Sequence, residues 1–469
     1  MMPAGILVAV VSGLAFGALL WVLPGGSVAV LLAGAALALT LLRRPLWGLL
    51  LFAVLATSIP YTTVNLGVRT TLSEAMLALT WCGLLCQAPF VQQGLVTPWR
   101  VPERIMCALM LFSCVPLVAG MLMVNAEGAG LSNWLRWLSN LSPLLLVPLL
   151  LRGAQERDQL VVALLLGNLL MLLLSVGMFL KDRNAMSMIP LLADLRYAHP
   201  EAVKDIFSAN YQRMASPWVH PNLTGGVLAL FIPLALFYGW TQRGWRRLLG
   251  LGVALLGCAG LLFSISRGAI LALALVLLWL SFRRVPYSGR ILGLGMALAV
   301  ALVLFYPPLQ ERLATMFSST NASTEIRFDE YARFPEAMSR YPLGIGFKTD
   351  PPVPGSGLLG ISNLWLNFIY KIGVPGMLLF VAITVAWWRE VRPLGAVRRV
   401  TADNAIWLGC TAGVLAALLT GLFDHYFSFT PVLVALFWLL LGMSLQQVRL
   451  DPTATVGKFV EPRETKEQP

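Results

Sequence analysis

Residues 222–240 read NLTGGVLALFIPLALFYGW, a run that contains no charged side chain. A helix of this length crosses the roughly 30 Å hydrocarbon core of a bilayer. Comparable apolar runs recur along the whole chain, and helices satisfy their own backbone hydrogen bonds in lipid. Of the 469 residues, 58% are hydrophobic and 12% are charged, whereas a soluble domain carries about 25% charged residues. The sequence therefore predicts an all-α integral membrane protein.

We expect about 12–14 transmembrane helices in a single domain over residues 1–448. The candidate spans are residues 5–23, 27–42, 46–60, 73–90, 105–125, 132–151, 159–180, 222–240, 247–265, 268–282, 290–306, 364–388, 405–423 and 427–447. The first run lacks a basic N-terminal region and a clear cleavage site, so we interpret it as a span and not as a removed signal peptide. Residues 449–469 are expected to form a disordered cytoplasmic tail.

The formal net charge of +12 reflects basic residues that lie in alternate short loops. These residues are Arg43, Arg44, Arg100, Arg104, Arg152, Arg157, Arg243, Arg246, Arg247, Arg283, Arg284, Arg389, Arg392, Arg398 and Arg399. Loops rich in Lys and Arg stay in the cytoplasm. The basic balance therefore indicates a multi-pass protein of the cytoplasmic membrane and argues against a nucleic-acid partner.

Two long segments, residues 181–221 and 307–362, fall on the opposite side and hold most of the polar residues that could take part in chemistry. Loops of this length usually form lids or binding elements. In the second segment, Ser323 or Thr324 can cap an amphipathic helix that Glu325 favours in its first turn. Pro335 is expected to kink that helix or divide it in two. An interfacial helix with snorkelling arginines is the alternative interpretation of its charges.

The first segment ends in His220-Pro-Asn222, just before the quoted span. Pro221 biases His220 away from helical geometry, and Asn222 is expected to cap the span. Ser266-Arg267-Gly268 forms a tight turn between two other spans. An arginine at that depth contacts a lipid headgroup or binds another anion, and its guanidinium can grip a phosphate through two hydrogen bonds.

Several blocks, taken in order, resemble the O-antigen ligase and Wzy polymerase superfamily of membrane glycosyltransferases. Ser362-Asn363, followed after nine residues by Gly373-Val-Pro-Gly376, is similar to that superfamily's H-N-x9-G-x-x-G signature. The other similar blocks are Arg213 with His220-Pro-Asn222 and Gly225, Ser266-Arg267-Gly268, Arg327 with Tyr341-Pro-Leu-Gly344-Ile-Gly346, and Asp424-His425-Tyr426. The resemblance covers most of residues 210–447.

The resemblance implies a GT-C-like fold and a glycosyltransferase that acts at the outer, periplasmic face of the bacterial inner membrane. The implied donor is an oligosaccharide on undecaprenyl diphosphate, and the acceptor is a sugar hydroxyl. Membrane lipids and a chain-length regulator are the further partners. Neither a cofactor nor a metal is expected, because arginines can stabilise the leaving diphosphate.

One residue departs from the signature: Ser362 stands where the ligases place a histidine proposed to be catalytic. A serine at its ordinary pKa is a poor base, and the polymerases vary more at this position. We therefore expect a polymerase of O-antigen or exopolysaccharide. A ligase that transfers glycan to lipid A-core is the first alternative, and a transporter or flippase of lipid-linked glycan is the second. An inactive paralogue and a scaffold are further alternatives.

Within the blocks that carry the resemblance, we expect three groups of site residues. The candidate catalytic residues are His220, His425 and Asp424, because a histidine near its usual pKa suits proton transfer at neutral pH. The candidate diphosphate ligands are Arg213, Arg267 and Arg327. The candidate sugar-binding residues are Asn363, Tyr426 and Trp218.

Overall fold

The protein is described here from a computed structural model. The described residues are 25–65, 69–87, 99–124, 128–182, 188–198, 200, 213–214, 216–305, 310, 322–348 and 360–451. Within them, nine helices are long and apolar enough to cross a membrane, and three more apolar helices are shorter. The predicted all-α integral membrane fold is confirmed. The span predicted at residues 5–23 and residues 452–469 of the predicted tail lie outside the described residues.

The helices follow one another with short connections over most of the chain. They are α2 (Gly25–Arg43), α3 (Pro45–Ser58), α4 (Leu72–Gln87), α5 (Val101–Phe112), α6 (Cys114–Met123), α7 (Gly130–Leu141), α8 (Pro143–Leu150), α9 (Ala154–Asp182), α10 (Met188–Asp194), α12 (Pro221–Thr241), α13 (Gly244–Ser264), α14 (Arg267–Phe282), α15 (Ser288–Phe305), α17 (Ala322–Arg340), α18 (Leu364–Val391), α19 (Ala402–Thr420), α20 (Tyr426–Phe429) and α21 (Leu433–Leu450).

Two predicted spans are each divided into two helices. The run at 105–125 becomes α5 and α6, which together form Val101–Met123, one of the nine membrane-crossing helices, and the run at 132–151 becomes α7 and α8. Pro116 and Pro143 follow the two breaks, and a proline removes the hydrogen bond to the carbonyl four residues earlier. The run at 427–447 likewise becomes the short helix α20 and the longer α21, with Pro431 between them.

Two further features differ from the expectation. α17 is one helix through Pro335, so the predicted division into two pieces is wrong. The carbonyl that loses its partner there belongs to Tyr331, an exposed residue, and water can satisfy that carbonyl. A two-stranded antiparallel sheet, β1 (Thr63–Asn65) with β2 (Arg69–Thr71), was not predicted, because three-residue strands leave almost no periodic signal.

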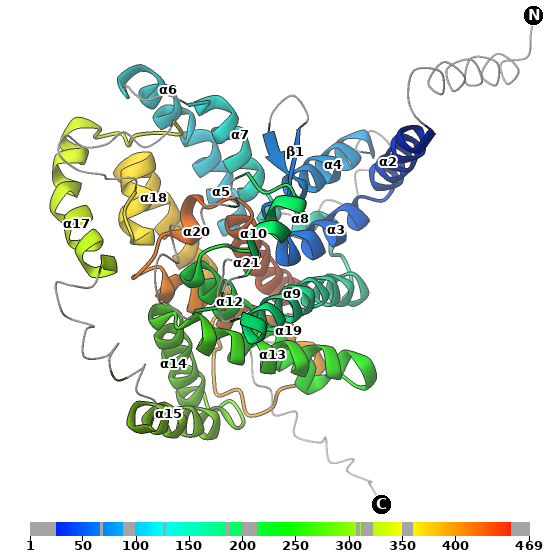
Figure 1. Cartoon of the computed structure of the whole chain (residues 1–469), viewed down its shortest axis with the longest axis vertical. Coiled ribbons are helices and arrows are strands. Elements are labelled where there is room, and N and C mark those ends of the chain that lie inside the picture. Colours follow the sequence, from blue (N-terminus) through cyan, green and yellow to red (C-terminus); the bar gives the residue numbers. More distant parts are fainter. Residues whose placement is uncertain are drawn as a thin grey trace, which may run out of the picture.

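Helices α12, α19 and α21 form the centre of the bundle. α12 packs against α13 and α19, and most of α12 and α21 is buried. α2 and α15 are largely exposed and lie at the periphery (Figure 1). Fully buried large side chains, among them Trp387, Trp407 and Trp438, fill the interior. Tight packing of this kind gives the polar end of the bundle a rigid base.

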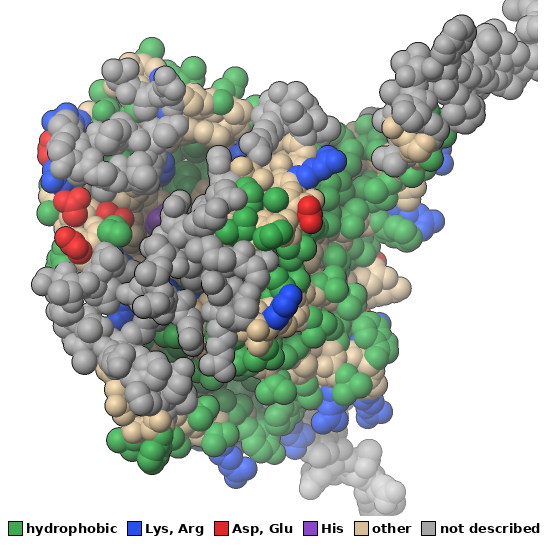
Figure 2. Space-filling model, viewed as in Figure 1, with side chains coloured by type: hydrophobic (Ala, Val, Ile, Leu, Met, Phe, Trp, Pro, Cys, Tyr) green, Lys and Arg blue, Asp and Glu red, His purple; other side chains and the backbone are tan. Residues whose placement is uncertain are grey.

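We use the term loop end for the end of the bundle that carries α10, α17 and α20. The beginnings of α12, α14, α18 and α21 and the ends of α13 and α19 lie there, because consecutive helices alternate in direction. α17 contacts α18 at one edge of the molecule (Figure 1). Acidic and basic side chains gather over α17, whereas hydrophobic side chains dominate the opposite half of the same view (Figure 2).

Candidate active site

The turn between α13 and α14 presents Arg267 at the loop end. Ile265 adopts a left-handed conformation, with φ of 50°, and ends α13, and Ser266 is the N-cap of α14. α12 approaches this turn so closely that a Cβ on Gly225 would lie 2.3 Å from the Cβ of Ser266. Only glycine permits that approach, so Gly225 is part of what places Arg267.

Arg213 holds the same turn from the other side. Its Nε donates to the carbonyl of Ser264 at 2.7 Å, and its Nη2 donates to Asn222 Oδ1 at 2.6 Å. The predicted diphosphate ligand is therefore engaged by protein acceptors and joins the α13–α14 turn to α12. It also interacts electrostatically with Asp424, so it contributes positive charge to the site.

His220 is the N-cap of α12, and its Nδ1 accepts a hydrogen bond from the backbone N–H of Asn222 at 3.1 Å. The capping role predicted for Asn222 is thus performed by His220, while Asn222 binds Arg213. As predicted from Pro221, His220 has an extended backbone. Burial, together with the charges of Arg213 and His425, lowers the pKa of His220 to about 4. His220 is therefore a neutral residue near pH 7.

Arg327 of α17 reaches Asp424, in the segment between α19 and α20, with Nη2 3.7 Å from Oδ1. Burial raises the pKa of Asp424 to about 7, and Glu330 also raises it. Arg327, a hydrogen bond from Tyr426 and Arg213 act in the opposite direction. A carboxyl group with a pKa near neutrality can exchange a proton under physiological conditions.

Arg267 is a further cation beside Arg327. It lies close enough to Arg327 for their charges to repel. Its Nη1 is buried and has no hydrogen-bond partner among the described residues. A buried guanidinium nitrogen without a partner is costly, and two neighbouring arginines are best stabilised by an anion that both can contact.

Glu330 and Ser362 form a contact that the sequence analysis did not assign to the site. Glu330 accepts a hydrogen bond from the backbone N–H of Ser362 at 2.6 Å and another from its hydroxyl at 3.1 Å. Burial raises the pKa of Glu330, although the bonds from Ser362 and the charge of Arg327 oppose the rise. The spacing from Arg327 to Glu330 and Tyr331 is three and four residues, which places them on one helical face. From the sequence alone, this spacing could have identified Glu330 as a site residue.

Asn363 and Tyr426 were predicted to bind sugar, and in this structure their side chains bind neighbouring protein groups. Asn363 is the N-cap of α18, with Oδ1 accepting from Trp365 N and Leu366 N, and its Nδ2 donates to the carbonyl of Leu422. Tyr426 hydrogen-bonds Asp424, and its hydroxyl lies 3.4 Å from His220 Nδ1. Both residues therefore hold the Asp424 segment in place.

The remaining two predicted residues are more deeply packed. His425 interacts with Lys371, and burial lowers the pKa of His425 to about 4, with Lys371 adding to the effect. Trp218 is fully buried, and its ring packs edge-on against Tyr61 with ring centroids 5.5 Å apart. Trp218 cannot stack on a bound sugar from that position, so this prediction is wrong. Its burial was hidden from the sequence because the neighbouring Tyr61 comes from a distant connection.

The glycines of two motif blocks contact one another. α18 is broken at Ile372 and Gly373, where Gly373 has φ of 71°. The chain at 344–346 packs into this break, and the backbone N–H groups of Ile345 and Gly346 donate to the carbonyls of Tyr370 and Lys371 at 2.9 Å. A Cβ on Gly344 would lie 2.5 Å from the oxygen of Lys371. These glycines connect the α17 region to α18.

Within the residues that the structure describes, no group of three or more His, Cys, Asp or Glu could hold a metal ion. The described site is a cluster of arginines and carboxyl groups. Arg267 and Arg327 can contact an anion. Asp424 can accept a proton near neutral pH, because its pKa is about 7.

Residues 252–381 match a family model described as O-antigen ligase. This match confirms the resemblance to the O-antigen ligase and Wzy polymerase superfamily. The matched residues include Arg267, Arg327, Glu330 and Ser362, whereas Asp424 lies beyond them. A comparison with curated proteins finds no match.

Proposed function

We propose that the protein polymerises a lipid-linked surface polysaccharide, an O-antigen or an exopolysaccharide, at the outer face of the bacterial cytoplasmic membrane. The donor is a growing glycan on undecaprenyl diphosphate, and the acceptor is a sugar hydroxyl of the next repeat unit. The observation that carries the proposal is the position of Arg327 at the loop end, where it lies beside Asp424 and close to Arg267. The O-antigen ligase match over residues 252–381 supports the same class of reaction.

On the donor side, Arg267 and Arg327 bind the diphosphate oxygens. The bond between the anomeric carbon and the diphosphate oxygen breaks, and undecaprenyl diphosphate leaves with the bonding electron pair. Positive groups placed where this negative charge develops stabilise the transition state. The unpartnered Nη1 of Arg267 supports its assignment as a diphosphate ligand. Arg213 fixes the turn that carries Arg267 and adds positive charge to the site.

On the acceptor side, the sugar hydroxyl oxygen bonds to the anomeric carbon and gives its proton to Asp424. A base works best when its pKa lies near the working pH, and the pKa of Asp424 is about 7. The pKa values of His220 and His425 are about 4. We therefore favour Asp424 as the base, with the two histidines as neutral neighbours.

Ser362 favours a polymerase over a ligase. Its hydroxyl is bound to Glu330, so the position that holds a histidine in the ligases here belongs to a serine–carboxylate pair. The second candidate is a ligase that transfers the glycan to lipid A-core. It is favoured by the description of the matching family as O-antigen ligase.

The deciding experiment incubates the purified protein with a lipid-diphosphate-linked repeat unit, with and without lipid A-core. A ladder of products from the repeat unit alone supports the polymerase. Transfer that requires lipid A-core supports the ligase and overturns the polymerase. Absence of product in both reactions, with a donor that another enzyme consumes, overturns both and directs attention to transport.

A further inference from the structure

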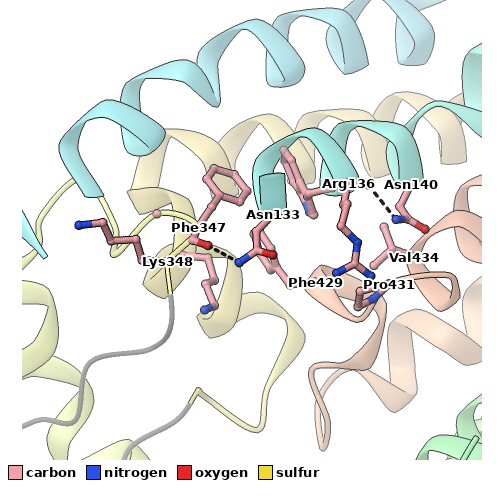
Figure 3. Close-up of a pocket in the computed structure, with 11 residues that line it drawn as sticks. Asn133, Arg136, Asn140, Phe347, Lys348, Phe429, Pro431 and Val434 are labelled. Carbon is pink, nitrogen blue, oxygen red and sulfur yellow. Dashed lines mark hydrogen bonds between the residues drawn. The ribbon is translucent and has the colours of Figure 1, made fainter. Parts of the chain in front are cut away.

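A second polar cavity lies beside the candidate active site. It has a volume of about 170 Å³ and is bordered by α7, the chain at 346–348, α18 and the beginning of α21. α7 contributes Asn133, Arg136 and Asn140, which recur every three to four residues and share one face. Figure 3 shows these three side chains together with Phe347, Phe429 and Val434. Convergent polar side chains in a concave site commonly fix the orientation of a bound ligand.

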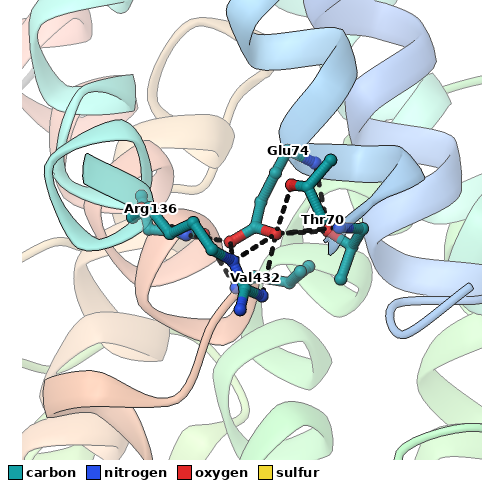
Figure 4. A network of polar contacts seen from close by, with 6 residues as sticks. Thr70, Glu74, Arg136 and Val432 are labelled. Atoms are coloured by element: carbon teal, nitrogen blue, oxygen red, sulfur yellow. Dashed lines mark hydrogen bonds and ion pairs between the residues drawn. The ribbon is translucent and has the colours of Figure 1, made fainter. Parts of the chain in front are cut away.

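Arg136 is held in place by Glu74 of α4 (Figure 4). Its Nε and Nη2 donate to Glu74 Oε2 at 3.1 and 3.0 Å, and Asn140 donates to Glu74 Oε1 at 2.8 Å. Thr71 donates to the same carboxylate through its N–H and hydroxyl. Arg136 Nη1 has no hydrogen bond within the described structure and is therefore available to a ligand. The buried Glu74 carboxylate fixes the position of the guanidinium but binds only its Nε and Nη2 atoms.

Lys371, beside the break in α18, also lines the cavity and brings its amine to it. The Lys348 ammonium donates to the carbonyls of Met121 and Val124 at 3.3 and 3.2 Å, and Figure 3 shows it directed away from Arg136. Trp137 and Phe429 stack at 5.2 Å and provide an apolar wall. No acidic residue is among the described residues that line the cavity.

The cavity and the site around Asp424 share one short segment of chain. Asp424 and Phe429 both lie on this segment, and its His425 interacts electrostatically with Lys371. Lys371 lies eight positions after Asn363, the N-cap of α18, which corresponds to about 12 Å along a helix. A saccharide that presents its hydroxyl to Asp424 can therefore extend towards the cavity.

We infer that this cavity binds the acceptor sugar and selects one that carries a carboxylate or phosphate group. This inference rests on the proposed glycosyl transfer. Arg136 Nη1, the Lys371 amine and the Asn133 N–H that does not bind Phe347 offer donors for an anionic substituent and for hydroxyls, and the aromatic wall faces the apolar side of a sugar ring. The volume is below the roughly 300–1,000 Å³ of pockets for drug-sized ligands. It therefore suits a single sugar unit.

Direct binding tests the inference without requiring transfer. The protein, in nanodiscs of phosphatidylcholine, is titrated with methyl glucuronide, glucose 6-phosphate and the neutral methyl glucoside, with binding followed by ligand-observed NMR. We expect at least one acidic probe to bind about tenfold more tightly than methyl glucoside. Lys371→Met and the double variant Glu74→Gln/Arg136→Gln should remove that preference. The double variant avoids leaving a buried charge without its partner.

Lys348→Gln is the matched control, because its ammonium is directed away from the cavity, and it should retain the preference. The inference is overturned if neither acidic probe binds better than the glucoside, or if both cavity variants keep the preference. It is also overturned if phosphatidylglycerol nanodiscs abolish acidic-probe binding, since a lipid headgroup then occupies the cavity. Acidic-probe binding without any glycan transfer would reject the proposed function while leaving the binding site intact.

Discussion

The carboxylate of Glu330 accepts hydrogen bonds from the backbone N–H of Ser362, at 2.6 Å, and from its hydroxyl, at 3.1 Å. Glu330 lies on α17 and Ser362 lies just before α18, so this pair joins the two helices at the loop end. Arg327, one turn before Glu330, reaches Asp424. One turn of α17 thus links Ser362, at the position of the missing family histidine, to the proposed base.

Substitution of this pair separates a positioning role from a catalytic one. In Ser362→Ala the N–H bond to Glu330 remains, so we expect the transfer rate to fall by less than about tenfold, as for loss of one hydrogen bond. Glu330→Gln weakens both bonds and should lower the rate more. Initial rates of product-ladder formation provide the measurement. Complete loss of transfer in Ser362→Ala would show that the serine itself takes part in the reaction.

Arg267→Gln should lower the transfer rate by about 100- to 1,000-fold, the usual cost of removing a group that stabilises developing negative charge. The lipid-linked donor should still bind and stay unreacted. Arg246→Gln is the control, because Arg246 forms a partly exposed ion pair with Asp158 at 2.9 Å, at the opposite end of the bundle. Equal transfer rates for the two variants would show that Arg267 is not a diphosphate ligand.

The pH profile should report Asp424. A base must be deprotonated, and its pKa is about 7, so kcat/KM should rise as pH increases from 5 to 8 and be half-maximal at about pH 7. Asp424→Asn should have a low rate with no such rise. A half-maximal point at about pH 4 would instead assign the base to one of the histidines.

Arg327→Gln should shift that profile. Arg327 lowers the pKa of Asp424, so its removal should raise this pKa and move the half-maximal point to higher pH. The maximal rate should also fall, since Arg327 is proposed to contact the diphosphate. Arg340→Gln, on the same helix with an exposed pair to Glu336 at 2.8 Å, should leave the profile unchanged. An unshifted profile in Arg327→Gln would contradict the coupling.

Gly225→Ala should destabilise the protein by about 1–3 kcal/mol, the usual cost of overpacking. The added methyl would lie 2.3 Å from Ser266 Cβ and displace the turn that carries Arg267. Gly252→Ala is the matched control, because nothing lies within 4 Å of its added Cβ. Thermal unfolding in the same detergent measures both, and the control should melt at or above the temperature of the native protein, since alanine favours helix. A similar melting temperature for both variants would show that the turn tolerates the methyl group.

Several features could be predicted because their signals are local. The apolar runs predicted the spans, and Pro221 predicted the extended backbone of His220. Arg267 and Arg327 were selected from motif blocks, and the structure places Arg327 close to Arg267 and beside Asp424, while their role as diphosphate ligands stays a prediction. These predictions used hydropathy and short spacing, both of which are visible along a single segment of chain.

Other assignments needed contacts between distant segments. Trp218 and Tyr426 were both considered as sugar ligands, but one is packed against Tyr61 and the other holds Asp424. His220 performs the capping role expected of Asn222, because the Asn222 side chain accepts a hydrogen bond from Arg213. Whether a polar side chain serves a cap, a neighbour or a ligand depends on which partners the packed helices bring to it.

The sequence by itself determined that this protein is a multi-pass helical membrane protein with its polar residues concentrated in two long segments. Lipid solubility and backbone hydrogen bonding require this, whatever the tertiary arrangement. Only the tertiary structure decided that Arg327 meets Asp424, that Glu330 binds Ser362, and that the polar face of α7 borders a cavity. Burial then moves the pKa of Asp424 towards neutrality. Desolvation depends on all the atoms that surround a group, and the packing of distant helices determines those surroundings.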